Sequence, residues 1–250
     1  MIFPALRDTH MHMLITVNAA WNIWNFRQRL VATLLTDGHR VTILAPADAS
    51  VPDLERLGCQ FVDLDMNAKG LGPLQNLRLM LRFRQHFTAL RPDVILSYTV
   101  KNNIFGAIAA RPLRIPFLPN VTGLGTAFLS GGPLQALAVL LYRHSFRPLK
   151  VIFFQNSDDL QLFLNRRIVH SAQARLLPGS GIDLKRFETA EFSPLPDQPV
   201  FLMIARLLRD KGVLEFVEAA RKVKAQIPGA RFSFWVPPGL RAAQPLMPGP

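Results

Sequence analysis

Short runs of apolar residues alternate along this chain with longer segments of helical periodicity. The apolar runs are continuous, which is typical of strands that are buried on both faces. Strands joined by crossover helices form a parallel sheet covered by helices on both sides. We therefore predict an α/β fold with a doubly wound, Rossmann-like parallel sheet, where ligands bind outside the carboxyl ends of the strands. The expected strands are residues 13–17, 40–45, 59–64, 93–97, 115–120, 150–154 and 174–177, and the expected helices are 21–36, 51–57, 74–90, 103–111, 133–146 and 157–166.

A change in composition divides the chain after the seventh strand. Residues 188–199 hold three prolines and three acids without periodicity, so we expect a linker there. A strand, a helix and a strand then begin a second α/β domain. The expected organisation is an extension over 1–12, an N-terminal domain over 13–187, the linker, an incomplete second domain over 200–235, and a disordered, proline-rich tail over 236–250.

Composition excludes several classes of protein. Apolar residues make up 49% of the chain and charged residues 18%, which excludes global disorder. The one cysteine, Cys59, excludes an intramolecular disulfide framework and a multi-cysteine metal site. A chain without disulfides is typical of a cytoplasmic protein. No apolar run reaches about 18 residues, and the first dozen residues lack the apolar stretch of a signal peptide. We therefore expect a cytoplasmic protein, and we expect any association with the membrane to be peripheral.

The positive charge is concentrated in one third of the chain. The net charge is +12, and the stretch 66–150 holds eleven basic residues and one acid, Asp93, which is a net +10. Such a field favours an anionic partner, either a phosphate-bearing ligand or an acidic membrane surface. The alternative is a solvated basic face without a partner. The chain has no nucleic-acid-binding motif and no interleaving of aromatic and basic residues, so we expect no nucleic-acid partner.

Polar residues follow the first and fourth expected strands, where a ligand would lie. Asn18 and Asn22 flank the start of a helix, whose N-terminal N–H groups attract anions. Lys101 and Asn102 follow the fourth strand, and the lysine is a candidate for a phosphate contact. In both loops helix capping or a surface lysine is an equally simple interpretation.

The loop after the fifth strand contains Thr122, Gly123 and Gly125. Two glycines beside hydroxyl groups allow a close approach of the backbone to a ligand, although a tight turn would need the same residues. The histidines and acids show no convincing ligand spacing, so we expect no metal.

The sharpest signal lies in the second domain, between its first strand and its helix. Arg206 and Lys211 stand in this loop, where a diphosphate binds in an α/β unit. Arginine offers a planar fork for phosphate oxygens and lysine a mobile point charge. An exposed basic turn is the alternative interpretation.

Six motifs, taken in order, resemble one family. They are MLITVNAAWNIWNFR, SYTVKNNIFGAIAA, NVTGLGTAF, FFQNSDD, LPGSGIDLKRF and IARLLRDKG. The chain resembles, over about residues 13–235, the N-terminal half of retaining GT-B glycosyltransferases of family 4 with a subfamily-4-like N-terminal domain. The similarity is greatest to bacterial enzymes that extend polyprenyl-diphosphate-linked oligosaccharides or exopolysaccharides.

The resemblance implies that the two domains bind different substrates. The first domain would hold a polyprenyl-diphosphate-linked or saccharide acceptor, at an anionic membrane surface. The second would hold a nucleotide sugar, with UDP as the expected nucleotide. Arg206 and Lys211 would bind the donor diphosphate and stabilise the leaving group, without metal or another cofactor.

Two departures from the family pattern limit what the resemblance implies. Thr122 stands where many members have a histidine, so no catalytic base is assigned. The paired-glutamate motif of the donor domain has no counterpart, which suggests truncation or a shifted reading frame and predicts a chain inactive alone. The alternative is a non-enzymatic module that binds a membrane surface or a partner protein.

Overall fold

The computed structural model describes residues 10–67, 72–124, 132–184, 187–189, 198–205, 207 and 211–236. The chain divides into two compact units, residues 1–187 and 188–250, which are described separately. The expected disordered tail, apart from Val236, lies outside the described residues. Most of the expected extension and most of the linker lie outside them as well.

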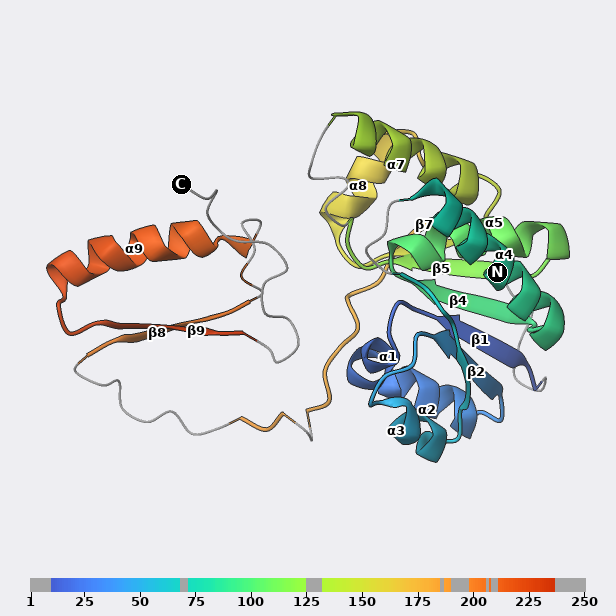
Figure 1. Cartoon of the computed structure of the whole chain (residues 1–250), viewed down its shortest axis with the longest axis horizontal. Helices are drawn as coiled ribbons and strands as arrows, with labels where there is room; N and C mark the ends of the chain where they lie inside the picture. Colours follow the sequence, from blue (N-terminus) through green and yellow to red (C-terminus); the bar gives the residue numbers. More distant parts are fainter. Residues whose placement is uncertain are drawn as a thin grey trace. The chain divides into compact units, whose positions relative to one another are not determined.

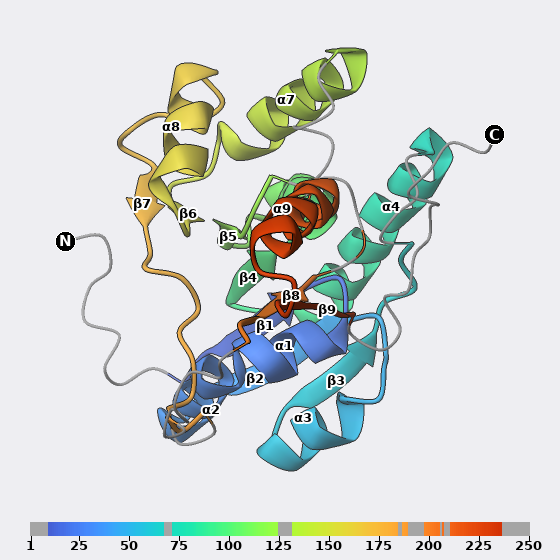
Figure 2. The same cartoon turned by 90° about the vertical axis from the view of Figure 1, so that its left-hand side faces the viewer.

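The first unit is built on a seven-stranded sheet in the order β3-β2-β1-β4-β5-β6-β7 (Figure 2). Every pair of neighbouring strands is parallel. The chain order reverses between β1 and β4, which is where doubly wound sheets bind ligands. The predicted α/β class with a Rossmann-like parallel sheet is confirmed. The strands are β1 (His12–Thr16), β2 (Arg40–Ala45), β3 (Gln60–Asp63), β4 (Val94–Tyr98), β5 (Phe117–Val121), β6 (Ile152–Phe154) and β7 (Ala174–Leu176).

Successive residues of the central strands face opposite layers of helices (Figure 1). Leu14 and Leu44 belong to the larger core, together with residues of α4, α5, α7 and α8. Ile15 and Ile43 belong to the smaller core, with residues of α1, α2 and α3. The helices are α1 (Ala20–Phe26), α2 (Gln28–Thr36), α3 (Val51–Leu57), α4 (Pro73–Leu90), α5 (Ala107–Ala110), α7 (Gly132–Phe146) and α8 (Ser157–Asn165).

The first strand begins one residue earlier than the sequence suggests. His12 was expected in an extension, but it is the first residue of β1 and is buried. Its backbone N–H donates to Asp93 Oδ2 at 2.6 Å, and its ring lies 2.8 Å from Thr42 Oγ1. These bonds to neighbouring strands fix His12 in the sheet, so the expected boundary after residue 12 is wrong.

Two expected helices are interrupted. The expected helix over residues 21–36 breaks at Arg27, whose backbone leaves the helical region with φ −137° and ψ 9°. The helix expected from residue 103 starts as a π-helical segment, η1 (Asn102–Gly106), and ends in the 3₁₀ turn η2 (Arg111–Leu113). Apolar spacing continues through both interruptions, so periodicity could not reveal them. Such interruptions often occur beside functional sites.

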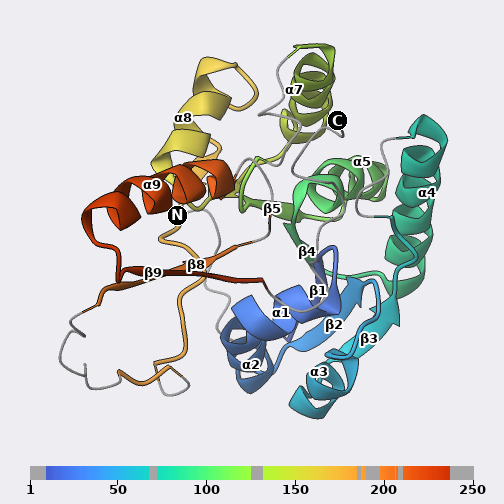
Figure 3. The ribbon, with the colours of Figure 1, turned by 60° about the vertical axis from the view of Figure 1, so that its left-hand side comes forward.

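The second unit pairs β8 (Val200–Ile204) with β9 (Arg231–Trp235) in parallel, joined by α9 (Val213–Gln226) (Figure 3). Phe216 of α9 packs edge-on against Phe234, with ring centroids 4.9 Å apart. Large side chains such as Leu202 and Trp235 remain more than half exposed. Across both units, no described helix is long and apolar enough to cross a bilayer.

Candidate functional site

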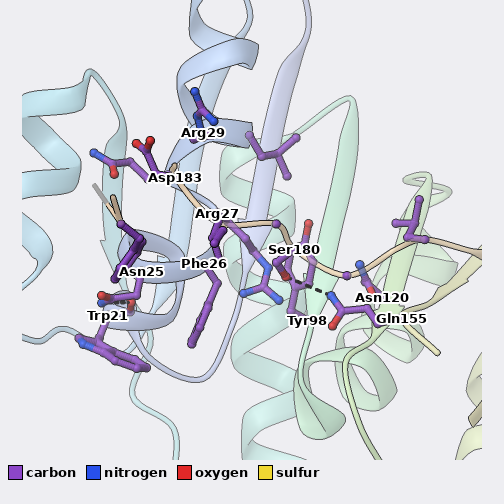
Figure 4. A pocket seen from close by; sticks show the side chains of 17 residues that line it. Trp21, Asn25, Phe26, Arg27, Arg29, Tyr98, Asn120, Gln155, Ser180 and Asp183 are labelled. Carbon is purple, nitrogen blue, oxygen red and sulfur yellow. Dashed lines mark hydrogen bonds between the residues drawn. The ribbon is translucent and has the colours of Figure 1, made fainter. Parts of the chain in front are cut away.

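A cavity of about 570 Å³ opens at the carboxyl edge of the first unit's sheet (Figure 4). Its floor includes Tyr98 and Asn120, which lie at the ends of β4 and β5. Gln155 follows β6, and the loop 177–183 follows β7. The opposite wall is the α1–α2 junction, residues 25–30. The position is the one where a doubly wound sheet binds its ligand.

Arg27 is the buried cation of this cavity. The residue is 6% exposed, and its guanidinium stacks 3.8 Å from the centroid of the Tyr98 ring. Nη1 donates to the backbone oxygen and to Oδ1 of Asn22, while Nε is buried without a partner. Burial lowers the pKa of Arg27, and burial likewise raises the pKa of Tyr98 against the opposing effect of the nearby guanidinium. The arginine remains protonated at neutral pH.

The carboxyl edge of the sheet contains several buried polar atoms without hydrogen-bond partners, and one of them, on Asn120, lines the cavity. They are Ser97 Oγ on β4, Asn103 Oδ1 on η1 and Asn120 Oδ1 on β5. An unsatisfied buried polar atom costs about 1–3 kcal/mol. Their concentration at the carboxyl edge lowers the stability of this region and leaves groups there that can bind a polar ligand.

The rim of the cavity is aromatic on one side and glycine-rich on the other. The rings of Trp21 and Phe26 meet edge to face at 5.4 Å, and both remain about half exposed. On the other side, Gln155 Nε2 donates to Ser180 Oγ at 3.2 Å, which links the loops after β6 and β7. Apolar rings beside polar loop groups suit an amphipathic ligand.

The side chains of the residues singled out after the fourth strand form hydrogen bonds within the first unit. Asn102 is fully buried, and its Nδ2 donates to Thr16 Oγ1 at 2.8 Å while its Oδ1 accepts from Thr99 Oγ1 at 2.9 Å. Lys101 Nζ donates to the backbone oxygen of Asn67 at 2.7 Å, and burial lowers the pKa of this lysine. Neither side chain lines the cavity. The proposed phosphate contact of Lys101 stays a prediction.

None of the other expected acceptor residues that the structure describes lines the cavity. Asn22 holds Arg27, and Asn18 lies in the loop between β1 and α1. Thr122 and Gly123 follow β5. Gly123 has φ +149°, which other residues rarely adopt, and no atom of the described residues lies within 4 Å of where a Cβ would stand. The close approach of a ligand to this backbone stays a prediction.

The remaining predicted residues are Gly125 in the first unit and Arg206 and Lys211 in the second. Gly125 and Arg206 lie outside the described residues. Lys211 directly precedes Gly212, the residue before α9. Among the described residues, no three His, Cys, Asp or Glu side chains cluster as a metal site would require.

Sequence reasoning missed the cavity's central residues. Arg27 was hidden inside what looked like one continuous helix. Tyr98 stood directly after the expected strand 93–97, and Asn120 was the last residue of the expected strand 115–120. Their position was the available signal, because residues at the carboxyl ends of β4 and β5 must border the ligand site of a doubly wound sheet. The inward turn of Arg27 depends on the break between α1 and α2, which leaves no trace in the apolar pattern.

Comparison with known proteins agrees with this architecture. The model of the glycosyl transferase 4-like domain matches residues 23–179. A relative from Campylobacter jejuni, N,N'-diacetylbacillosaminyl-diphospho-undecaprenol alpha-1,3-N-acetylgalactosaminyltransferase, is 27% identical over 223 residues, which cover 83% of this chain. The chain spans 59% of the length of that relative.

Two solved structures share the fold. A glycosyltransferase from Rickettsia africae matches with a TM-score of 0.62 and 14% identity, over 93% of this chain and 69% of its own. Anabaena Alr3699/HepE, solved with UDP and glucose, matches with a TM-score of 0.61 and 16% identity. The match covers 91% of this chain and 69% of the Anabaena chain. Because the domain model matches well over half of the sequence, this chain belongs to the glycosyl transferase 4-like family, with the GT-B type of fold.

Proposed function

We propose that this chain is the acceptor-binding part of a glycosyltransferase that moves a sugar from a nucleotide sugar to a polyprenyl-diphosphate-linked acceptor. The match of the glycosyl transferase 4-like domain over residues 23–179 carries the proposal. The Campylobacter relative is named for transfer to a diphospho-undecaprenol acceptor, which supports the acceptor class. These matches favour an enzyme part over a non-enzymatic binding module. The cavity and its buried cation suit an anionic, partly apolar ligand.

For the second unit we propose the role of a donor-binding domain. Its described residues provide two strands and one helix. We assign Arg206 and Lys211 to the donor diphosphate and expect UDP as the nucleotide. Transfer requires that donor and acceptor be held in one defined geometry. The half-exposed apolar side chains of β8 and β9 are surface that a larger domain would cover.

We expect the 250-residue chain alone to bind acceptor but to transfer no sugar. The test incubates purified chain with UDP-sugars and a farnesyl-diphosphate-linked saccharide, and it measures acceptor binding by calorimetry and product by mass spectrometry. Binding without product is the expected result. Turnover of about 1 per second or more would refute the inactivity, while failure to bind the acceptor would refute the proposed function.

For the partner surface we propose an anionic membrane, contacted by α7. Its exposed side carries Leu137, Leu140, His144 and then Arg147, which follows the helix. Apolar side chains beside basic ones fit the interface of an acidic bilayer. Arg111 and Arg143 add charge nearby, lining a surface hollow with Leu140 and Arg147.

Replacing Arg147 with glutamine should weaken membrane binding about fivefold, since one basic residue near an anionic surface contributes about 1 kcal/mol. The measurement is co-flotation with vesicles containing phosphatidylglycerol, against vesicles of phosphatidylcholine alone. Arg56→Gln on α3, across the sheet from α7, is the matched control and should leave flotation unchanged. Equal binding to both kinds of vesicle, or none, would contradict the proposal.

A further inference from the structure

The charge balance inside the cavity is incomplete. Arg27 is buried, and among the described residues no carboxylate forms an ion pair with it. The Tyr98 ring and the oxygens of Asn22 compensate part of its positive charge. Removing a charged group from water is unfavourable, and a partner of opposite charge offsets part of that cost. A guanidinium in this state is therefore prepared for an anion that enters the cavity.

A second unsatisfied group lies on the same cavity. Asn120 is 7% exposed, its Oδ1 has no donor, and it lines the cavity together with Arg27. The backbone oxygen of Asn120 accepts from Asn103 Nδ2 at 2.9 Å, which fixes this residue at the end of β5. An unused acceptor thus accompanies a cation without a counter-ion. A ligand that carries both a phosphate and a hydroxyl group would satisfy both.

The aromatic rim adds a third requirement. Trp21 is 52% exposed and Phe26 is 47% exposed, on the side of the cavity formed by α1. Their edge-to-face contact holds the rings together, so they present a fixed apolar surface. Burial of this surface by an apolar chain would increase the affinity in proportion to the apolar area removed from water.

From these three features we infer that Arg27 is the residue that binds the acceptor's diphosphate, with Asn120 accepting from a hydroxyl of the attached sugar and Trp21–Phe26 contacting the apolar chain. This inference rests on the proposed function and specifies its acceptor site. The planar fork of arginine matches phosphate oxygens, which a lysine at the same position would contact through a single point charge. UDP has no apolar chain, so it would cover less of the rim than a polyprenyl chain does.

The test compares calorimetric affinities for a farnesyl-diphosphate-linked N-acetylhexosamine, for farnesyl diphosphate and for UDP. Arg27→Lys keeps the charge and removes the fork, so we expect at least a tenfold loss of affinity for the lipid-linked sugar. Arg56→Lys, an exposed arginine paired with Asp53, is the matched control and should bind like the original chain. Asn120→Asp adds a negative charge to the cavity and should weaken binding as well.

A spectroscopic readout separates ligand binding from a structural role. The arginine Nε–H resonances of the labelled chain are recorded with and without the lipid-linked sugar, and the signal lost in Arg27→Lys identifies Arg27. A ligand-induced shift of that signal supports the inference. Unchanged affinity in Arg27→Lys, an unmoved Arg27 signal, or equal binding of UDP would overturn it while leaving the proposed function standing. If the original chain bound no lipid-linked ligand, both would fail.

Discussion

Replacing Phe163 with alanine should lower the free energy of unfolding of the first unit by about 3–5 kcal/mol. Phe163 is fully buried on α8, and its ring lies between those of Tyr142 and Phe154, with centroids 5.1 and 5.2 Å away. The substitution would remove these contacts and leave a cavity that rigid neighbours cannot fill. The rings join α7 and α8 to β6, so the loops after β6 and β7 depend on them.

Denaturant unfolding followed by circular dichroism measures this effect. Phe26→Ala, which truncates a half-exposed phenylalanine, is the matched control and should cost less than about 1 kcal/mol. A loss below about 1 kcal/mol in Phe163→Ala would show that the aromatic cluster is not the anchor of this end of the sheet.

Replacing Asn102 with alanine should cost about 2 kcal/mol of stability. The buried amide joins Thr16 at the end of β1 to Thr99 after β4, and both hydrogen bonds would be lost. These bonds close the sheet at the point where its chain order reverses. If Asn102 is structural, as its burial indicates, affinity for the acceptor in the folded variant stays within about twofold of the original.

Asn18→Ala provides the comparison, because Asn18 follows β1 on the same edge and is only partly buried. Its change in unfolding free energy should stay within about 0.5 kcal/mol. A stable Asn102→Ala variant that has lost acceptor binding would instead place Asn102 in contact with the ligand.

The sheet could be predicted from sequence because its signal is local and repeated. Continuous apolar runs such as residues 40–45 mark strands buried on both faces, and the structure places β2 at those residues. The side-chain arrangement of the site has no such signal. Arg27 turns inward where two helices meet, and Asn102 turns into the sheet through a π-helical segment. Both depend on contacts between strands far apart in sequence, which periodicity does not encode.

The expected acceptor residues show how much of the site can be predicted from the position of a residue after a strand. Polar loop residues after strands were expected to meet the ligand, and Asn22, Lys101 and Asn102 do lie at the carboxyl edge. Of these, Asn22 orients Arg27, and Asn102 supports the sheet. The residues that line the cavity come from the ends of β4 and β5, from the helix junction and from the loops after β6 and β7, where no site residue was expected from the sequence. A polar residue in the right loop can act on a site without forming its wall.

Hydrogen exchange of the chain, with and without a farnesyl-diphosphate-linked saccharide, tests the central claim most directly. The claim is that the acceptor binds at the carboxyl edge of the first unit, between the α1–α2 junction and the loop after β7. We predict slower exchange in residues 20–30 and 177–183, with little change in α9. Protection confined to residues 200–235, or no protection anywhere, would contradict the account.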